Sequence, residues 1–334
     1  MDLRTDYLGL KLAHPIVASA SPLSRDLDGI RRLEDAGAAA VVMPSIYEEE
    51  IAAEDDAYQA LVEQGSFTQP EAAGGYFPDM TAYRLGGLQA RLETLERAAG
   101  ACAIPIIASL NGSTPHGWTG FARDLERAGA AAIELNLYRV PTDPHESGAD
   151  VERRWLETVT AVCAAVSVPV SVKLGPWLSS PGHHALRVAA SGARGLVLFN
   201  RFYEPDIDLA TLTPKPSLEL STPYEIRQAL LWIALLAGRI DASLAATSGV
   251  ETADEVVKYL LAGADVVMTA SSLLRHGPGH IAVLRRGLEQ WMEGRGFDDI
   301  ARLRGRLAVA YLHDRESLVR AQYIHILKGY QSGP

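Results

Sequence analysis

Lys173 is the residue whose position most constrains the chemistry of this chain. It lies near the end of the apolar run Val168-Pro-Val-Ser-Val-Lys-Leu174, which has the length and composition of a buried strand. An ammonium group at the end of such a strand is costly unless an anionic partner is near. The position suits a Schiff base, a contact to a phosphate, or stabilisation of negative charge on a reduced flavin. The alternative is a lysine whose ammonium group simply reaches solvent.

Asparagines end three further apolar runs of the same kind. Asn111 follows Pro105-Ile-Ile-Ala-Ser-Leu, Asn136 follows Ala132-Ile-Glu-Leu, and Asn200 follows Gly195-Leu-Val-Leu-Phe. A side-chain amide donates and accepts hydrogen bonds at once, which suits the edge of a heterocyclic ring. One such asparagine alone is a turn residue, but three at equivalent strand ends predict a shared site. Glu134 lies inside the second run and is expected to be a buried carboxylate with its hydrogen bonds satisfied.

Two turns near the C-terminal end of the chain have the chemistry of a phosphate site. They are Thr247-Ser-Gly249 and Thr269-Ala-Ser271, each placed between an apolar run and a helical pattern. Backbone N–H groups at such turns can bind a phosphate dianion. Gly249 permits close approach of the backbone because it lacks a Cβ. The alternative is two ordinary strand-to-helix turns.

These side chains share a site only if the strands that carry them run parallel and meet at one end. The chain alternates short apolar runs with helical stretches, which favours an α/β fold of the (βα)8 TIM-barrel class, where chemistry gathers at the carboxyl ends of the strands. A doubly wound sheet is the competing architecture. The predicted strands cover 15–20, 39–43, 104–110, 131–136, 168–174, 195–199, 241–247 and 264–269.

We expect the whole chain, 1–334, to form a single barrel domain with additions. These are an N-terminal hairpin with one arm at 8–12, irregular insertions after strands 2 and 6 at 45–85 and 200–221, and a C-terminal helical tail over about 276–328. A loop as long as 45–85 in a compact domain is usually functional, so we predict that it is a lid.

The bulk composition limits the class of partner. The net charge is −10 and the pI near 5.4, which argues against nucleic-acid binding because that needs a basic face. The sequence has 2 cysteines and no CxxC, which disfavours a metal or iron–sulfur site in this chain. No run approaches the roughly 20 apolar residues that span a bilayer. These features, and an N-terminus without an apolar secretory core, predict a cytoplasmic protein that does not bind membranes.

The order of the strand ends resembles a known family. The matching segments are Leu8-Gly-Leu-Lys-Leu12, the strand end Ala18–Ser21, the run that ends in Lys173-Leu174, Thr247-Ser-Gly-Val-Glu-Thr-Ala-Asp254 and Leu261-Ala-Gly-Ala-Asp-Val-Val-Met-Thr-Ala270. Over nearly its whole length the chain resembles class 1 dihydroorotate dehydrogenases, which are FMN-dependent barrels with the flavin across the mouth. No GxGxxG, Walker A, HExxH or GxSxG motif favours another cofactor or nucleophile.

The resemblance implies a role for each matching residue. Ala20 and Ser21 would approach the flavin ring, and Lys173 would contact the flavin and stabilise it when reduced. The remaining flavin contacts would come from Asn111 and Asn136, with the phosphate held by Ser248, Gly249, Thr269 and Ala270. Asn200 matches an asparagine that binds the pyrimidine substrate. Relatives of this class are dimers, so a homodimer is expected.

The substrate side departs from the family pattern. Where the family has Asn-Leu-Ser-Cys-Pro-Asn, with the cysteine as catalytic base, this chain has Asn136-Leu-Tyr-Arg-Val-Pro141. Arg139 stands at the base position and stays protonated at any ordinary pH. Arg139 and Arg201 would together make a cationic pocket that binds a small anionic substrate by bidentate pairing. Tyr138 or Tyr203 would then supply or accept the proton.

The leading hypothesis is an FMN oxidoreductase acting on a small anionic C–C substrate, with Lys173, Tyr138 and Arg139 as catalytic residues. One alternative is a genuine dihydroorotate dehydrogenase of pyrimidine biosynthesis in which water or Tyr138 replaces the cysteine. A second is a flavin-binding protein without turnover, and a third is an aldolase that uses Lys173 as a Schiff base. Transfer of electrons through iron–sulfur clusters would require a partner subunit, because this chain has no cluster ligands.

Overall fold

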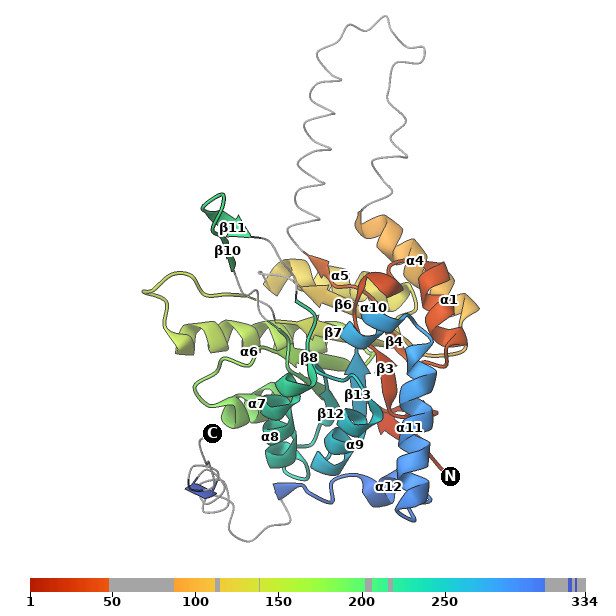
Figure 1. The fold of residues 1–334 in the computed structure, drawn as a ribbon. Coiled ribbons are helices and arrows are strands. Elements are labelled where there is room, and N and C mark those ends of the chain that lie inside the picture. The colour runs from red at the N-terminus through yellow and green to blue at the C-terminus, as the bar shows by residue number, and fades with distance from the viewer. Residues whose placement is uncertain are drawn as a thin grey trace, which may run out of the picture.

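The computed structural model of the chain describes residues 1–47, 87–111, 115–137, 139–201, 206–215, 219–309 and the isolated positions 324, 325 and 328 (Figure 1). Within these ranges the chain forms a closed parallel β-barrel surrounded by helices, which confirms the predicted (βα)8 TIM barrel. The sheet has nine strands in the order β4-β3-β13-β12-β9-β8-β7-β6-β5, and β4 also pairs with β6.

Two of the nine strands are segments of one barrel strand. Val41 of β4 pairs with Ile106 of β6, and Ile46 of β5 pairs with Leu110 of the same strand. The barrel therefore has eight strand positions, with a break around Pro44 in the second. The strands are β3 (Ile16–Ala18), β4 (Val41–Val42), β5 (Ile46–Tyr47), β6 (Ile106–Asn111), β7 (Ala132–Asn136), β8 (Val170–Leu174), β9 (Gly195–Leu198), β12 (Ser243–Ala246) and β13 (Val266–Thr269).

Helices cover the outer face of the barrel (Figure 1). They are α1 (Leu27–Asp35), α4 (Leu88–Ala101), α5 (Pro115–Arg127), α6 (Gly148–Ala165), α7 (Pro181–Ala190), α8 (Ile226–Leu236), α9 (Ala253–Ala262), α10 (Ser271–His276), α11 (His280–Gly294) and α12 (Ile300–Leu303). Local sequence sets their ends: α9 begins with a capping box between Thr252 and Glu255 and ends at Gly263, whose φ is +116°.

Strict alternation along the strands separates two hydrophobic layers. Outward-facing residues such as Ile106, Ala108 and Leu110 of β6 belong to the larger cluster between sheet and helices. Ile107 of the same strand belongs to a smaller cluster inside the barrel. Because successive side chains of a strand point to opposite faces, Ser109 and Asn111 share the inward face with Ile107. The same alternation directs Glu134, Asn136, Ser171 and Lys173 inward.

The N-terminal hairpin closes the end of the barrel where the strands begin. β1 (Thr5–Tyr7) and β2 (Leu10–Leu12) pair through a two-residue turn in which Leu8 and Gly9 both have positive φ. The Leu8 N–H donates to Ser243 Oγ at 3.1 Å, at the start of β12. A Cβ on Gly195 would lie 2.5 Å from Leu8 Cδ2, so the hairpin packs directly on the start of β9. The opposite, carboxyl end is left for the site.

Two predicted segments differ in detail from the structure. The insertion predicted from residue 45 starts later, because Ile46 and Tyr47 continue the second barrel strand along β6. The insertion after β9 is not wholly irregular, because β10 (Asp206–Asp208) and β11 (Thr213–Lys215) form a hairpin that extends away from the barrel (Figure 1). The rest of the predicted lid, 48–85, lies outside the described residues. The predicted C-terminal tail is described over 276–309, where α11 and α12 are helical as expected, and most of 310–328 lies outside the described residues.

Candidate active site at the carboxyl ends of the barrel strands

Six polar side chains form a ladder on the inward faces of three neighbouring strands. Ser109 pairs in register with Glu134, and Glu134 with Ser171, while Asn136 of β7 lies opposite Lys173 of β8. All six are buried in the otherwise apolar barrel: Ser109, Asn111, Glu134, Asn136, Ser171 and Lys173. Buried polar groups are costly unless they are paired, so their gathering at one end of the barrel marks this end as the candidate active site.

Lys173 lies over a buried carboxylate. Its Nζ is 3.7 Å from Glu134 Oε1, and the Glu134 side chain is 1% exposed. Neither carboxylate oxygen of Glu134 accepts a hydrogen bond from the described residues. Glu134 is therefore buried as expected, but its expected hydrogen bonds are not found there. The charge of Lys173 thus has one close ionic partner in the described part of the chain, and the rest of its surroundings at the mouth are open to an anionic ligand.

The amides of Asn136 and Asn200 are joined in a chain of hydrogen bonds. Asn200 Nδ2 donates to Asn136 Oδ1 at 2.8 Å, and Asn136 Nδ2 donates to Ser45 Oγ at 3.4 Å. Ser45 Oγ in turn lies 2.8 Å from Ser109 Oγ. This series of hydrogen bonds fixes the orientation of both amides across the mouth. It joins residues in or just after four barrel strands: the second, β6, β7 and β9.

Asn111 is different, because its amide is buried without a complete set of partners. The residue is 3% exposed, and its Nδ2 finds no acceptor among the described residues. An unsatisfied buried donor costs free energy. At the mouth of a barrel it is also a donor held ready for a ligand acceptor, which fits the predicted contact to a cofactor ring.

A cavity of about 240 Å³ opens beside Lys173. Most of its walls come from the ends of β3, β9, β12 and β13 and from the segment that returns after β11. The lining residues are Ser19, Ala20, Ser21, Pro22, Lys173, Phe199, Asn200, Arg201, Glu219, Leu220, Ser221, Thr247, Ser248, Gly249, Thr269, Ala270, Ser271 and Leu274. The structure thus brings together nine of the thirteen residues predicted for the site, namely Ala20, Ser21, Lys173, Asn200, Arg201, Ser248, Gly249, Thr269 and Ala270.

The backbone of the turn after β12 packs closely against Thr222 and Ile226. Ser248 and Gly249 both have positive φ, at 76° and 70°. A Cβ on Gly249 would lie 2.6 Å from Thr222 O and 2.8 Å from Ile226 Cγ2, so no larger residue fits without movement. The Gly249 N–H donates to Ser221 Oγ at 3.0 Å. A phosphate oxygen at this N–H would take the place of that hydroxyl.

Tyr259 of α9 supports this turn from behind. Its hydroxyl donates to Thr247 O at 3.2 Å and to Ser248 O at 3.1 Å. Burial, followed by the negative charges of Glu255 and Glu225, raises the pKa of Tyr259 far above its usual range. The phenol therefore remains protonated and donates to the carbonyl groups of this turn.

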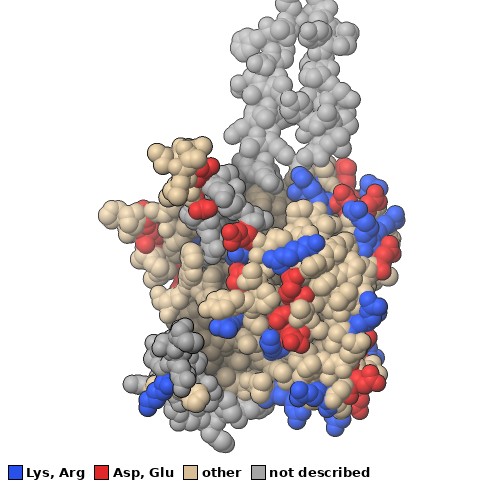
Figure 2. Space-filling view, viewed as in Figure 1, with Lys and Arg blue, Asp and Glu red and all other residues tan. Residues whose placement is uncertain are grey.

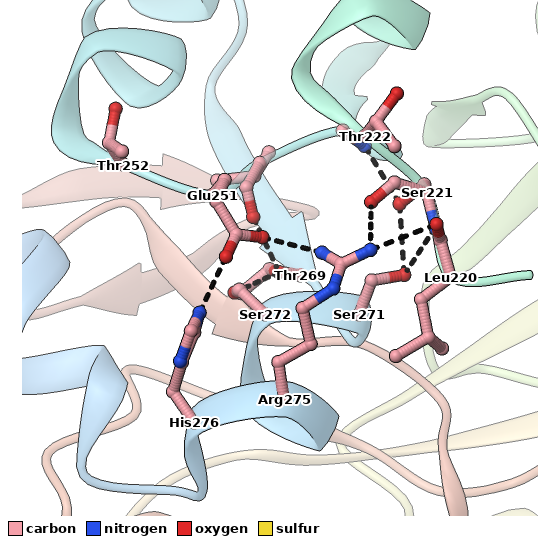
Figure 3. Close-up of polar contacts among 12 residues, drawn as sticks. Leu220, Ser221, Thr222, Glu251, Thr252, Thr269, Ser271, Ser272, Arg275 and His276 are labelled. Carbon is pink, nitrogen blue, oxygen red and sulfur yellow. Dashed lines mark hydrogen bonds and ion pairs between the residues drawn. The ribbon is translucent and has the colours of Figure 1, made fainter.

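Arg275 links the return of the second insertion to the turn after β12 (Figure 3). Its Nη1 lies 2.6 Å from Glu251 Oε2, and its Nη2 donates to Leu220 O and Ser221 O at 2.9 Å each. His276 Nε2 lies 2.5 Å from the other oxygen of Glu251. Burial alone would raise the pKa of Glu251, but hydrogen bonds from His276 and Arg275 lower it overall. The carboxylate therefore stays charged and anchors the network.

The two predicted cationic residues lie in different surroundings. Arg201 lines the cavity, where its Nε lies 2.8 Å from Glu225 Oε1 and its Nη1 donates to Glu219 O. Arg139 lies outside the set of lining residues, and its Nη1 is 3.0 Å from Glu146 Oε1. Glu146 also pairs with Arg154.

The sequence also predicts two tyrosines and a threonine for the site. Tyr138 and Tyr203 lie outside the described residues. Thr269 directs its hydroxyl to Val250 O and Ser272 Oγ.

Sequence reasoning missed Ser45, Ser221 and Arg275. Ser45 follows Pro44 at the end of the second predicted strand, so the rule that polar residues end the strands would have selected it. Ser221 and Arg275 carry no such signal, because their roles depend on how the insertion folds back onto α10.

In Figure 2, acidic and basic side chains are interspersed over the visible face without one extended basic patch. Within the described ranges, no three His, Cys, Asp or Glu side chains gather as metal ligands. Among the helices that the structure describes, none has the length and apolar character needed to cross a bilayer.

Comparison with known proteins connects this geometry to a family. A family model for dihydroorotate dehydrogenase matches residues 81–292. The catalytic subunit of a dihydroorotate dehydrogenase B (NAD(+)) from Methanothermobacter thermautotrophicus is 26% identical over 318 residues, covering 91% of this chain and 97% of that protein. The corresponding subunit from Methanocella arvoryzae is 28% identical over 293 residues, covering 85% and 91%.

A relative of different specificity also matches. The chloroplastic dihydropyrimidine dehydrogenase (NADP(+)) of Arabidopsis thaliana is 26% identical over 223 residues, covering 61% of this chain and 52% of that protein. The family match spans well over half of the chain, and the resemblance inferred from the strand ends is confirmed. The chain therefore belongs to the dihydroorotate dehydrogenase family, and it is an oxidoreductase acting on CH–CH groups.

Proposed function

We propose that this protein is an FMN-dependent oxidoreductase that transfers hydride between a small anionic C–C substrate and flavin N5, with a substrate pocket altered from that of its relatives. The observation that carries the proposal is the cavity at the barrel mouth, which Lys173, Ala20 and Ser21 line together with the predicted phosphate turn. Members of the family are flavoproteins, which supports the choice of cofactor.

The residues present fit an FMN molecule. Asn111 holds a buried amide donor without an acceptor, and Lys173 holds a buried ammonium group with one carboxylate 3.7 Å away. Ser248 and Gly249, in the predicted phosphate turn, line the same cavity as Lys173. A heterocycle with several acceptors, joined to a phosphate, is the ligand that uses all three features.

Bound FMN would supply the two-electron oxidation or reduction of a C–C bond. The chain's own residues would orient and charge the site. Asn111 would donate from Nδ2 to the ring, and Lys173 Nζ would place positive charge beside it. The backbone N–H groups of Ser248, Gly249 and Ala270 would hold the phosphate at the turn that Tyr259 supports.

The substrate would bind between the ring and Asn200. Lys173 and Arg201 both line the cavity, and this positive charge favours an anionic substrate. Arg139 Nη1 lies 3.0 Å from Glu146 Oε1. Arg139 would therefore bind the substrate only after breaking this ion pair. We propose that Tyr138 gives or takes the proton at its hydroxyl, because it precedes Arg139 at the segment where relatives carry the catalytic base.

The proposal extends to partners and location. Two relatives are named as catalytic subunits of NAD-dependent enzymes, which supports an electron-transfer partner for this chain. The functional unit would be a cytoplasmic homodimer without nucleic-acid or membrane contacts, as the sequence predicts.

The first test is the absorption spectrum of the purified protein, followed by anaerobic titration with dihydroorotate. A flavin spectrum with FMN released by heat supports the cofactor assignment. Bleaching by dihydroorotate would mean that the altered segment still performs the reaction of its relatives with another base. Bleaching by other small anionic C–C compounds, and not by dihydroorotate, supports the altered pocket. A bound flavin that no substrate reduces would leave a flavin-binding protein without turnover.

Variants test the assigned roles. Arg139→Ala and Tyr138→Phe should each lower kcat/KM at least tenfold, whereas Arg127→Ala, which removes an exposed ion pair with Asp124 on α5, should not. Unchanged turnover in the first two variants would remove both residues from the mechanism. A colourless protein that takes up no FMN, with a carbonyl ligand trapped on Lys173 by borohydride, would favour Schiff-base chemistry instead.

A further inference from the structure

We propose that Glu134 is the buried counter-charge of Lys173 and that it limits how strongly the barrel mouth stabilises negative charge on a reduced flavin. The proposal rests on the proposed function, because it concerns the charge that Lys173 presents to the ring. Glu134 would act through Lys173 and is therefore a positioning residue.

The two groups are placed together by the register of the sheet. Glu134 lies two residues before Asn136 on the inward face of β7, and Asn136 lies directly opposite Lys173 on β8. Lys173 Nζ is 3.7 Å from Glu134 Oε1, and the two side chains are 11% and 1% exposed. The separation is longer than a hydrogen bond, so the contact is one of charge.

The other neighbours of Glu134 on this side of the barrel are neutral. Ser109 and Ser171 lie beside it in register on β6 and β8. Tyr7 projects from the hairpin, and burial together with the charge of Glu134 raises the pKa of its phenol far above the usual range. Within the described residues, the one ion pair recorded for Glu134 is therefore that with Lys173.

This arrangement changes what Lys173 offers to a ligand. An isolated ammonium group in a site of low dielectric constant would attract negative charge strongly. With Glu134 beneath it, the pair presents a small net charge and a dipole whose positive end faces the mouth. Neutralising Glu134 removes the negative charge that offsets Lys173 and makes the mouth more positive. The reduced form of a bound flavin, which is more negative, is then stabilised more than the oxidised form.

The decisive measurement is the two-electron reduction potential of bound FMN in Glu134→Gln, which keeps the size of the side chain. We expect the equilibrium to shift toward the reduced form by about tenfold, or about 30 mV more positive. The matched control is Asp265→Asn, which neutralises another buried, ion-paired carboxylate, beside Arg304 near the start of β13. Its potential should be unchanged. A shift in Glu134→Gln that is absent, negative or equalled by the control overturns the proposal.

Melting of the FMN-free protein tests the ion pair without the cofactor. Lys173→Met leaves the Glu134 carboxylate buried and unpaired, and should lower the melting temperature strongly. The double variant Glu134→Gln/Lys173→Met carries no charge at either position and should melt at a higher temperature than Lys173→Met. Additive effects of the two substitutions would overturn the pairing.

The two measurements distinguish the two levels of the proposal. If the two substitutions have non-additive effects on the melting temperature but the protein takes up no FMN, the proposed function is overturned together with the flavin part of this inference. Glu134 and Lys173 are then an ion pair with a structural role only. FMN uptake with an unshifted potential overturns this inference alone. If Glu134→Gln does not fold, the double variant compared with Lys173→Met provides the same test, and the double variant should have the more positive potential.

Discussion

The side-chain amide of Asn200 donates a 2.8 Å hydrogen bond to Oδ1 of Asn136, from the end of β9 to the end of β7. Strand β8 lies between these two strands, and its Lys173 is opposite Asn136 in register. The bond therefore passes across the barrel mouth beside Lys173 and fixes both amides relative to the ammonium group. Because Asn136 also donates to Ser45, its amide has little freedom to turn toward a ligand.

Asn111 and Asn136 should respond differently to the same substitution. Asn136→Leu breaks two hydrogen bonds and should lower the free energy of unfolding by about 1–3 kcal/mol. Asn111→Leu removes a buried donor that has no acceptor among the described residues, so unfolding of the FMN-free protein should change by less than about 1 kcal/mol. FMN affinity should nevertheless fall about tenfold, or about 1.4 kcal/mol, in Asn111→Leu.

Urea unfolding of the FMN-free variants and fluorescence titration with FMN provide both measurements. A loss of stability in Asn111→Leu as large as that in Asn136→Leu would show that the Asn111 amide is satisfied within the protein. An unchanged FMN affinity would remove Asn111 from the cofactor site.

The barrel could be predicted from the sequence because its signal is local and repeated. Each strand is a short apolar run, and the polar residue that ends it, such as Lys173 or Asn136, marks the carboxyl end. In a parallel barrel all such ends meet at one mouth. A rule that uses only sequence order therefore selects residues that lie together in space, even when they are separated by 64 positions, as Asn136 and Asn200 are.

The parts that could not be predicted depend on contacts between segments without a periodic signal. The second strand was expected to stop at Pro44, yet Ile46 and Tyr47 rejoin β6 because a proline interrupts the ladder without ending the strand direction. The ion pair of Arg139 with Glu146 depends on the path of the loop after β7. Likewise, the contact of Ser221 with Gly249 exists because the second insertion returns to the mouth.

Gly249→Ala should destabilise the protein more than the same change at Gly296. Both residues have positive φ, at 70° and 71°, so each alanine carries a backbone cost of roughly 1–2 kcal/mol. A Cβ at Gly249 would in addition meet Thr222 O at 2.6 Å, whereas nothing lies within 4 Å of a Cβ at Gly296. We therefore expect a further loss of about 1–3 kcal/mol at Gly249.

Urea unfolding measures this difference, and titration with FMN adds a functional comparison. FMN affinity should fall in Gly249→Ala and remain unchanged in Gly296→Ala. Equal losses of stability in the two variants would contradict the close packing of the turn against Thr222 and Ile226.

Arg275 should contribute to stability where an exposed arginine does not. Arg275→Gln removes the ion pair with Glu251 and the bonds to Leu220 O and Ser221 O, and should lower the free energy of unfolding by about 2 kcal/mol. Arg302→Gln breaks an exposed pair between Arg302 of α12 and Asp298, and it should not measurably change the free energy of unfolding. Limited proteolysis within 200–221 should also become faster in Arg275→Gln. Similar unfolding curves for the two variants would show that the network in Figure 3 adds no stability.

Two buried histidines should make the protein less stable as the pH falls from 7 to 5. His14 Nδ1 accepts the Ile16 N–H at 3.2 Å, and Nε2 lies 2.7 Å from Gly37 O, so the ring is neutral with its proton on Nε2. Burial lowers the pKa of His14, although the bond to Gly37 and the charge of Glu289 oppose this and Arg285 adds to it. Burial likewise lowers the pKa of His184, against the charge of Glu152.

In both cases the unfolded chain binds a proton at a higher pH than the folded protein does. The stability that this difference provides is complete above the unfolded pKa of about 6.5 and is lost as the pH falls below it. Each histidine can contribute a slope of at most about 1.4 kcal/mol per pH unit. Urea unfolding at pH 5, 6, 7 and 8 should show a shallower slope in His14→Gln than in the unsubstituted protein, and the same in His184→Gln. A slope unchanged in both variants, or stability that rises toward pH 5, would mean that these rings are protonated in the folded protein.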